Sequence, residues 1–465
     1  MTPQFNAHRR NILKSLTGAT LLGAAAARTE KAQQTMAQAT RGLPSPKIKD
    51  ISVIETQPGG TRLTVVKVTT DQDGLYGYGC ATFTQRAELV RPAVERYLKP
   101  LLLGKPTDRI EDTWQMCYDS SYWKNGPVLN NAISGIDQAL WDIKGRQVGL
   151  PVYQLVGGKC REAAEVFGSI GGDAKSTVER AKQMNEQSGI TKFRIGGGGG
   201  GGGRGRGGAE PAAVVPPEAA RRGPKVLHDR PLLDRETYYR STLKLLDDVS
   251  KDLPSGFKLA TDIHSRLSSH NAVQFCKECE RFPIFFLEDP VAPEEIAWFK
   301  QIREQCTTPI AMGELFNSPH EWQPLIEQRL IDYIRLHVSQ VGGFSPARKV
   351  ALFCENYGVF TAWHAPGDLS PVGHMANVTL DVTSYNFGLQ EWGPYGASVG
   401  EVFSGIAEMK DGYLWVSEKP GWGVEIDMKA AAKFPFSDAG GRGGRVGLNG
   451  GWGDERLPDG TVVKQ

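Results

Sequence analysis

The chain has 465 residues, 40% of them hydrophobic, and a formal net charge of +2. This length and hydrophobic content predict a globular protein of two or three domains. The near-neutral charge disfavours a broad surface for nucleic acid or anionic membrane. We therefore expect small-molecule chemistry and no nucleic-acid partner.

The first forty residues have the features of an export signal. Arg9 and Arg10 precede a short apolar stretch, residues 16–27, that is rich in Gly and Ala. The stretch is too short to span a bilayer as a helix, and the arginine pair is typical of the twin-arginine type. We expect residues 1–40 to direct export to the periplasm, with no membrane association afterwards. The alternative is a disordered basic leader.

The next segment, residues 45–158, combines strand and helix patterns. Alternating β-branched residues over 47–78 are punctuated by Gly59-Gly60 and Asp73-Gly74, which predicts antiparallel strands joined by turns. A helix follows, because apolar residues recur every three or four positions at Ile133, Ile136, Ala139, Leu140 and Ile143. The result is an α+β module.

From 159 to 398, short apolar runs alternate with helical segments. Seven or eight such units predict an α/β fold, a (β/α) barrel of the TIM type. Residues 399–465 are too short for a further domain. We expect them to return to the first module and to end in a glycine-rich tail.

The sequence RIGGGGGGGGRGRGG at 194–208 interrupts this pattern. A phosphate-binding loop is disfavoured because no Lys-Ser/Thr pair follows the glycines. An RNA-binding segment is disfavoured because the arginine–glycine tract is short and the net charge is small. We predict an inserted loop, residues 196–233, between two strands of the barrel. It is either a lid over the site or an insertion without a catalytic part.

Three apolar runs each end in an acid, at Asp262, Glu288 and Glu314, at equal intervals along the chain. In a barrel, one βα unit separates each pair, so the three carboxylates would lie on adjacent strands at the C-terminal rim. Three oxygen ligands without a cysteine favour Mg²⁺ over zinc. The repetition distinguishes them from isolated loop or capping acids.

Two histidines have matching positions. His264 lies two residues beyond Asp262, and His364 follows the apolar run GVFTAW. Either imidazole could serve as a general acid or base, because it titrates close to neutral pH. Lys192 is another candidate for the base.

Arg335 and Glu391 follow later strand runs. The arginine could hold a substrate carboxylate, and the glutamate could accept hydrogen bonds from sugar hydroxyls. The alternative for each is a salt bridge within the barrel.

Extended motifs make the chain similar to a known family. AISGIDQALWDIKGRQVGLPVYQLVGG, FFLEDP, TTPIAMGELFNS, HAPGDLSPVGHMAN and NFGLQEW resemble the enolase superfamily, and within it the mannonate dehydratase subgroup that includes starvation-sensing proteins. The resemblance implies a capping domain over 45–158, a modified barrel over 159–398 and a homo-oligomer. It also implies Mg²⁺ held by Asp262, Glu288 and Glu314.

In that family a base removes the proton alpha to a sugar carboxylate, the metal stabilises the enediolate, and an acid expels the β-hydroxyl. The product is a 2-keto-3-deoxy acid. By resemblance, His264 is the acid and Arg194 assists a tyrosine base. The substrate would be lined by Arg335, His364, Asp368, Glu391, Trp123, Ser169 and Thr84.

The sequence departs from the family pattern at three positions. No tyrosine occurs between Ile195 and Thr237, where the family has its base. Ser169 stands where the family has a histidine, and Thr84 where it has an asparagine. These departures favour a sugar acid other than mannonate, with His264, His364 or Lys192 as the base. A racemase or epimerase using Lys192 and His364, and a non-catalytic metal and sugar-acid sensor, remain open.

Overall fold

The computed structural model describes residues 45–196, 233–365, 367, 369–437 and 456–463. The predicted export leader, most of the inserted loop and Asp368 lie outside these residues. The described residues from Lys47 onward belong to one compact unit. Within the described residues, no helix has both the length and the apolar character needed to cross a membrane.

The first module is built on a three-stranded antiparallel sheet with the order β1-β2-β3. Its strands are β1 (Ile48–Thr56), β2 (Leu63–Thr70) and β3 (Tyr76–Cys80). The helical elements that follow or interrupt them are η1 (Pro58–Gly60), η2 (Thr84–Leu89), α2 (Val90–Pro92), η3 (Ala93–Leu98), α3 (Lys99–Leu102), α4 (Ile110–Tyr118), α5 (Pro127–Val148) and α6 (Val152–Leu155).

Helix α5 packs closely on β3 because glycines line the contact. Pro127 occupies the first turn of the helix and Gly149 ends it in the left-handed conformation, as both residues favour. A Cβ on Gly79 would lie 2.0 Å from the carbonyl oxygen of Gly135. The backbones of strand and helix therefore meet directly.

Eight parallel strands form the barrel, which confirms the predicted α/β fold class. They are β4 (Ala163–Ser169), β5 (Lys192–Ile195), β6 (Lys258–Asp262), β7 (Ile284–Glu288), β8 (Ile310–Met312), β9 (Tyr333–Ile334), β10 (Phe360–Thr361) and β11 (Gln390–Trp392). Neighbours pair in chain order from β4 to β10, and β11 pairs with β4. A parallel bridge between Thr361 and Phe387 closes the ring.

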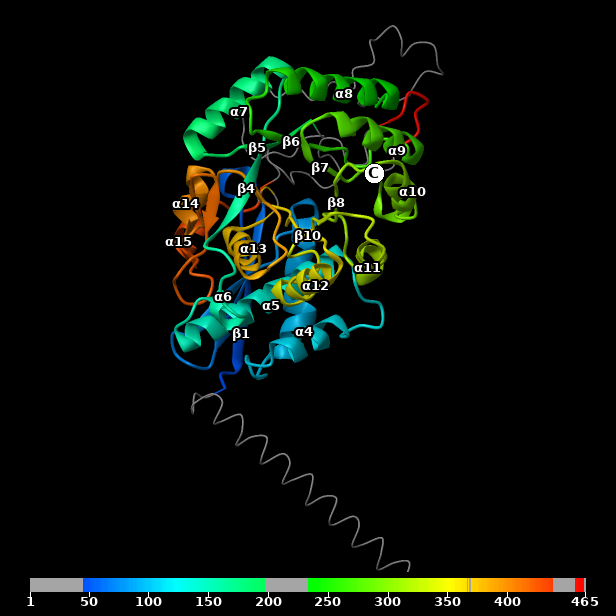
Figure 1. The fold of residues 1–465 in the computed structure, drawn as a ribbon. Helices are drawn as coiled ribbons and strands as arrows, with labels where there is room; N and C mark the ends of the chain where they lie inside the picture. The colour runs from blue at the N-terminus through cyan, green and yellow to red at the C-terminus, as the bar shows by residue number, and fades with distance from the viewer. Residues whose placement is uncertain (1–44, 197–232, 366, 368, 438–455, 464–465) are drawn as a thin grey trace, which may run out of the picture. The chain divides into compact units, whose positions relative to one another are not determined.

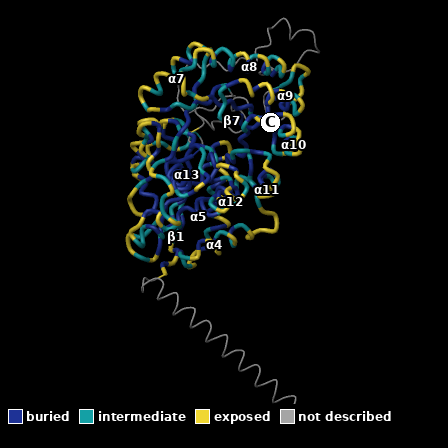
Figure 2. The backbone as a smooth tube through the Cα atoms, in the orientation of Figure 1, coloured by how far each residue is buried: buried dark blue, intermediate teal, exposed yellow. Residues whose placement is uncertain are grey.

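Helices connect these strands on the outside of the ring (Figure 1). They are α7 (Ala174–Ser188), α8 (Arg235–Asp252), α9 (Ser269–Glu278), η5 (Cys279–Arg281), η6 (Pro293–Glu295), α10 (Trp298–Gln305), α11 (Pro319–Glu327), α12 (Phe344–Tyr357) and α13 (Pro371–Thr383). Almost every residue of α13 is buried, as its dark tube in Figure 2 shows.

An apolar layer fills the barrel interior. It consists of Phe167, Ala260, Phe286, Ala311, Ala362 and Leu389. Because side chains alternate along each strand, the polar residues at the strand ends lie beyond this layer. The interior is therefore solid, and the C-terminal rim is the place for chemistry.

The first module contacts the barrel through helix α5 and its neighbour α4. Asp137 on α5 accepts hydrogen bonds from the backbone N–H and the hydroxyl of Ser345 at the start of α12. Asn130 donates to the carbonyls of Asn317 and Gln340, which follow β8 and β9. The module is thus fixed against loops of the C-terminal rim.

The segment after β11 contacts both parts. Its elements are α14 (Ala397–Val402), β12 (Phe403–Ser404), β13 (Glu408–Lys410), β14 (Tyr413–Trp415), β15 (Glu425–Ile426) and α15 (Met428–Ala431). β14 pairs antiparallel with the barrel strand β4. Glu425 forms an ion pair with Arg146 of α5.

Candidate functional site

Acidic side chains gather where consecutive barrel strands end. Asp262 and Glu288 are the last residues of β6 and β7 and lie opposite each other in register. Glu314 follows β8 after Gly313, which has a φ of 145° and lies against the backbone of Arg335. Asp262 and Glu288 are fully buried, and the side chain of Glu314 is mostly buried. The structure brings the three predicted ligands to one rim.

Two arginines neutralise part of this charge. Arg194 donates to Glu288 over 2.9 Å and to Glu391 over 2.6 Å. Arg335 donates to the second oxygens of the same two carboxylates. The result is a closed ring of two arginines and two glutamates. Although burial acts in the opposite direction, the arginines lower the pKa of Glu391 to about 2.

Both predicted histidines face Glu314. His264 Nε2 lies 3.2 Å from Glu314 Oε1 and 3.0 Å from Asp262 Oδ2. His364 Nε2 lies 2.9 Å from Glu314 Oε2. Glu314 is therefore held between an imidazole from the end of β6 and one from the end of β10.

These contacts shift the titration of the site. Burial lowers the pKa of His364, but the facing Glu314 outweighs it and raises the pKa to about 9. Burial would raise the pKa of Glu314, yet His364 and His264 hold it well below its ordinary value. Burial raises the pKa of Asp262 to about 7. Glu314 and the two histidines thus stabilise each other's charged forms, whereas burial disfavours the charged form of Asp262.

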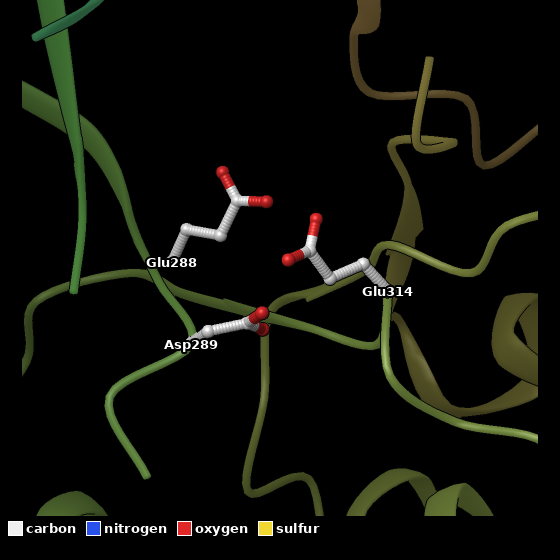
Figure 3. Close-up of side chains that lie close together, drawn as sticks. All are labelled: Glu288, Asp289 and Glu314. Atoms are coloured by element: carbon white, nitrogen blue, oxygen red, sulfur yellow. The ribbon is translucent and has the colours of Figure 1, made fainter. Parts of the chain in front are cut away.

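A fourth carboxylate, Asp289, was not found by sequence reasoning. Asp289, Glu288 and Glu314 each place one oxygen within 4.8 Å of the others, and Figure 3 shows the three side chains converging. Asp289 is fully buried, and burial together with Glu314 and Glu288 raises its pKa well above the ordinary value. The only sequence signal was the adjacent acid pair in FFLEDP.

These residues fit a divalent cation. The donors are hard carboxylate oxygens, which Mg²⁺ prefers. Both oxygens of Asp289 and Oδ2 of Asp262 are buried without a hydrogen bond among the described residues. Such oxygens are costly unless a positive charge lies close to them.

The structure corrects the interpretation of Lys192. It is the first residue of β5 and lies opposite Lys258, the first residue of β6, whereas Asp262 ends that strand. Its ammonium pairs with Glu165. The side chain shares the face of Arg194, as the spacing predicted, but lies at the amino end of the strands. Lys192 is therefore removed from the candidate bases.

Arg335 and Glu391 lie within the network of salt bridges at the rim. Arg335 is fully buried, and its third donor group binds the carbonyl of Ala362. Glu391 accepts from both arginines and from the backbone N–H of Ala365. Both residues therefore form the salt bridges that the sequence left open as the alternative, and their substrate roles stay predictions.

The other predicted substrate residues are dispersed. The Ser169 hydroxyl accepts from Arg194 Nε over 3.1 Å, close to the site. Thr84 is buried at the start of η2. Trp123 is 85% exposed in the loop between α4 and α5, with its ring edge-on to Tyr122. Asp368 lies outside the described residues. The substrate roles of Ser169, Thr84 and Trp123 stay predictions.

Comparison with known proteins agrees with this fold. Residues 44–157 match the N-terminal domain of mandelate racemase and muconate lactonizing enzyme, and residues 176–430 match the enolase C-terminal domain-like family. The class of protein is thus defined by a barrel that carries an α+β module and has acidic residues at the ends of its strands. The chain belongs to the enolase superfamily, in its mandelate racemase/muconate lactonizing enzyme family.

Individual relatives are similar over nearly their whole length. The chain is 45% identical over 421 residues to the D-galactonate dehydratase family member RspA of Pantoea ananatis, covering 89% of this chain and 98% of the relative. A Salmonella enteritidis member of the same family is 44% identical, with 90% and 98% covered. A crystal structure of an enolase from Pantoea ananatis with bound D-gluconate and Mg has a TM-score of 0.81 at 43% identity, covering 90% of this chain and 100% of that one.

Proposed function

We propose that this protein is a Mg²⁺-dependent acid-sugar dehydratase, a carbon–oxygen lyase that converts a sugar acid into a 2-keto-3-deoxy acid. The observation that carries the proposal is the pair of imidazoles, His264 and His364, facing one carboxylate of a four-carboxylate rim. Elimination of water needs one group to accept a proton and one to deliver a proton. The relative that binds D-gluconate and Mg supports a sugar acid as substrate.

Residues Glu288, Asp289 and Glu314 would hold the cation, together with the predicted ligand Asp262. Bound Mg²⁺ supplies positive charge beside the substrate carboxylate, which makes the adjacent C–H more acidic. The chain's own residues determine how the ligands are oriented. Arg194 and Arg335 fix the orientation of Glu288, so that its carboxylate keeps one position during turnover.

The two histidines divide the proton transfers. His364 Nε2 would accept the proton from the α-carbon, in place of the tyrosine that the family supplies from the inserted loop. His364 must be neutral to do so, and a cation beside Glu314 would offset the negative charge that raises the pKa of His364 in the cation-free protein. His264 Nε2 would deliver a proton to the departing β-hydroxyl. Lys192 is too far along β5 to share this work, which disfavours the racemase mechanism that used it.

The test is a screen of the purified protein with Mg²⁺ against hexonates, including D-gluconate, D-galactonate and D-mannonate, and against aldarates. We expect a 2-keto-3-deoxy acid from at least one hexonate other than mannonate. In D₂O, exchange at the α-carbon without elimination would instead indicate a racemase or epimerase. Binding of a sugar acid and Mg²⁺ with neither exchange nor elimination would support the non-catalytic sensor.

Substitution of the histidines tests the assignment of roles. We expect His364→Asn to abolish both α-proton exchange and elimination, because the base is lost. His264→Asn should retain exchange and lose at least about 100-fold in elimination, because only the acid is lost. His270→Asn, an exposed histidine of α9, is the matched control and should behave like the wild type. Loss of exchange in the His264 variant alone would reverse the roles.

We also propose that the protein is exported by the twin-arginine route and works as a homo-oligomer. Residues 9 and 10 carry the export proposal, and replacement of both by lysine should retain the protein in the cytoplasm. Fractionation of the expressing cells measures this, and sedimentation of the purified protein measures the subunit number. A double-lysine variant that still reaches the periplasm would contradict the export proposal. A monomeric protein would contradict the proposed homo-oligomer.

A further inference from the structure

Two buried thiols from different parts of the chain meet among the outer helices of the barrel. Cys276 belongs to the buried face of α9, and Cys306 is the residue at which α10 ends, in an extended conformation. The two helices lie side by side (Figure 1), and both cysteines belong to the same hydrophobic core. The thiol of Cys276 donates a hydrogen bond to that of Cys306. The two sulfurs are therefore neighbours, although a whole βα unit separates them in the sequence.

Hydrogen bonds beside this pair hold the two segments together. Thr308 donates from its hydroxyl to the carbonyl of Cys276 over 2.6 Å. Thr307 donates to the carboxylate of Glu280 from its backbone N–H over 2.5 Å and from its hydroxyl over 2.9 Å. The chain after α10 is thus tied to the end of α9 at two points next to the cysteines. A bond between the two sulfurs would join segments that the fold already holds in contact.

A third buried cysteine, Cys279, is less well placed for such a bond. It continues the helical turn three residues after Cys276. Cβ atoms at that spacing are about 5–6 Å apart, whereas a disulfide needs about 3.5–4.5 Å. A bond between these two would therefore require the helix to unwind. Among the described residues, the three cysteines also do not converge as a metal-binding group. The geometry selects Cys276 and Cys306.

The two selected thiols differ in how readily they ionise. Hydrogen bonds from Cys276 and from the backbone N–H of Thr308 lower the pKa of Cys306, and the nearby guanidinium of Arg303 acts in the same direction, although burial opposes them. The hydrogen bond to Cys306 and burial raise the pKa of Cys276 well above its ordinary value. Cys306 is buried, but the residues on both sides of it in the chain are exposed. It is therefore the thiol that an oxidant meets first.

We propose that Cys276 and Cys306 are a modification site at which oxidation forms an intrachain disulfide. The thiolate of Cys306 attacks the disulfide of an oxidant, such as oxidised glutathione or a protein disulfide, and one thiolate of the oxidant leaves. Cys276 then loses its proton, and its sulfur attacks that of Cys306 and displaces the other thiolate. In total, the two cysteines lose two electrons and two protons, and the oxidant is reduced to two thiols.

The bond would close a loop that contains β7, η6 and α10. Both cysteines precede strands, β7 and β8 respectively, so they lie at the amino ends of the barrel strands, away from the acidic rim. Because a crosslink stabilises chiefly by restricting the unfolded chain, we expect it to raise stability without rearranging the rim. The inference does not depend on the proposed dehydratase activity. The proposed export would carry the chain to a compartment in which disulfides form.

Peptide mapping tests the pairing, because Lys277 separates Cys276 from Cys279. Trypsin places Cys276 in a peptide that ends at Lys277 and Cys279 in the next peptide, residues 278–281, while Cys306 lies in a third. The reduced protein is incubated with oxidised glutathione, then alkylated in denaturant and digested without reductant. We expect mass spectrometry to find the peptides of Cys276 and Cys306 linked, and the Cys279 peptide alkylated.

Thermal unfolding tests the consequence of the bond. The protein carries Cys160→Ser, because that exposed thiol would otherwise take up glutathione or link two molecules. The oxidised protein should melt a few degrees higher than the reduced protein. Adding Cys306→Ser should abolish both the link and this gain. Adding Cys279→Ser is the matched control, because that cysteine is buried in the same core, and its variant should keep both.

Three outcomes would overturn the inference. A link between the peptides of Cys279 and either other cysteine would show that the assigned pair is wrong. Complete alkylation of all three cysteines, at every ratio of oxidised to reduced glutathione, would show that the site is not oxidised. A lower Tm in the oxidised protein would show that the bond distorts the fold instead of joining segments already in place.

Discussion

At the scale of single residues, the buried ring of Arg194, Arg335, Glu288 and Glu391 balances two positive and two negative charges. Each arginine contacts both glutamates, so no member is redundant. Removing two charges together from such a ring is tolerable, but removing one leaves an uncompensated buried charge. The ring fixes Glu288, one of the proposed cation ligands, more firmly than packing alone would.

Arg335→Met should therefore destabilise the protein by about 3–5 kcal/mol, because Glu288 and Glu391 lose a shared partner in a buried site. Denaturation with urea measures the loss. Arg303→Met is the control, because its salt bridge with Asp332 is partly exposed and should contribute about 1 kcal/mol or less. Equal losses in the two variants would show that the ring is not a special source of stability.

His374 gives a prediction about pH. Burial within α13 lowers its pKa to about 4, compared with an ordinary value of 6.5. Between these values the unfolded chain binds a proton that the folded protein does not, so stability is complete above pH 6.5 and falls as the pH drops toward 4. His374→Gln should remove about 3 kcal/mol of this total loss of stability across the window. An unchanged slope would place the acid sensitivity elsewhere.

The positions of some site residues could be predicted from the sequence, and those of others could not. The spacing of Asp262, Glu288 and Glu314 follows from one βα unit per acid, so it could be predicted without coordinates. The direction of the Asp289 side chain depends on a left-handed φ, and an aspartate in a loop gives no sequence signal for that conformation. The sequence placed Lys192 on the correct face of β5. Periodicity predicts which face a side chain occupies, but not how close it lies to the carboxyl end of the barrel.

At the scale of elements, glycine determines how α5 meets β3. Cβ atoms on Gly77 and Gly79 would lie 2.2 Å and 2.0 Å from carbonyl oxygens of α5. The sequence predicted both the strand and the helix from their periodicity. Their closeness was not predictable, because a glycine in a strand also fits a bulge or a turn.

Gly79→Ala should separate the helix from the sheet and cost at least about 2–3 kcal/mol, since neither backbone can move locally. Gly400→Ala is the control. That glycine lies in α14 with open space around its Cβ position, so alanine should be neutral or stabilise by up to about 1 kcal/mol. Thermal unfolding of both variants measures the difference. A neutral Gly79 variant would contradict the close contact.

At the scale of the whole molecule, one residue after the barrel joins the module to the barrel. Trp422 donates from its indole N–H to the carbonyl of Gln138 and from its backbone N–H to Asp142, both on α5. Its ring lies 5.2 Å from that of Phe344 on α12 of the barrel. Composition and strand patterns indicated that the last segment returns to the module, but not that a single tryptophan would contact both parts.

Trp422→Ala should cost about 3–5 kcal/mol, because a fully buried indole is replaced by a cavity and the carbonyl of Gln138 loses its indole donor. Trp415→Ala, in the same segment but 40% exposed, should cost much less.

The contacts of Asp137 with Ser345 and of Asn130 with Gln340 remain in both variants. Module and barrel should therefore still unfold together, with a lower urea midpoint and an unchanged slope. A shallower or two-step transition in the Trp422 variant would mean that the C-terminal segment, rather than helix α5, makes the two parts one cooperative unit.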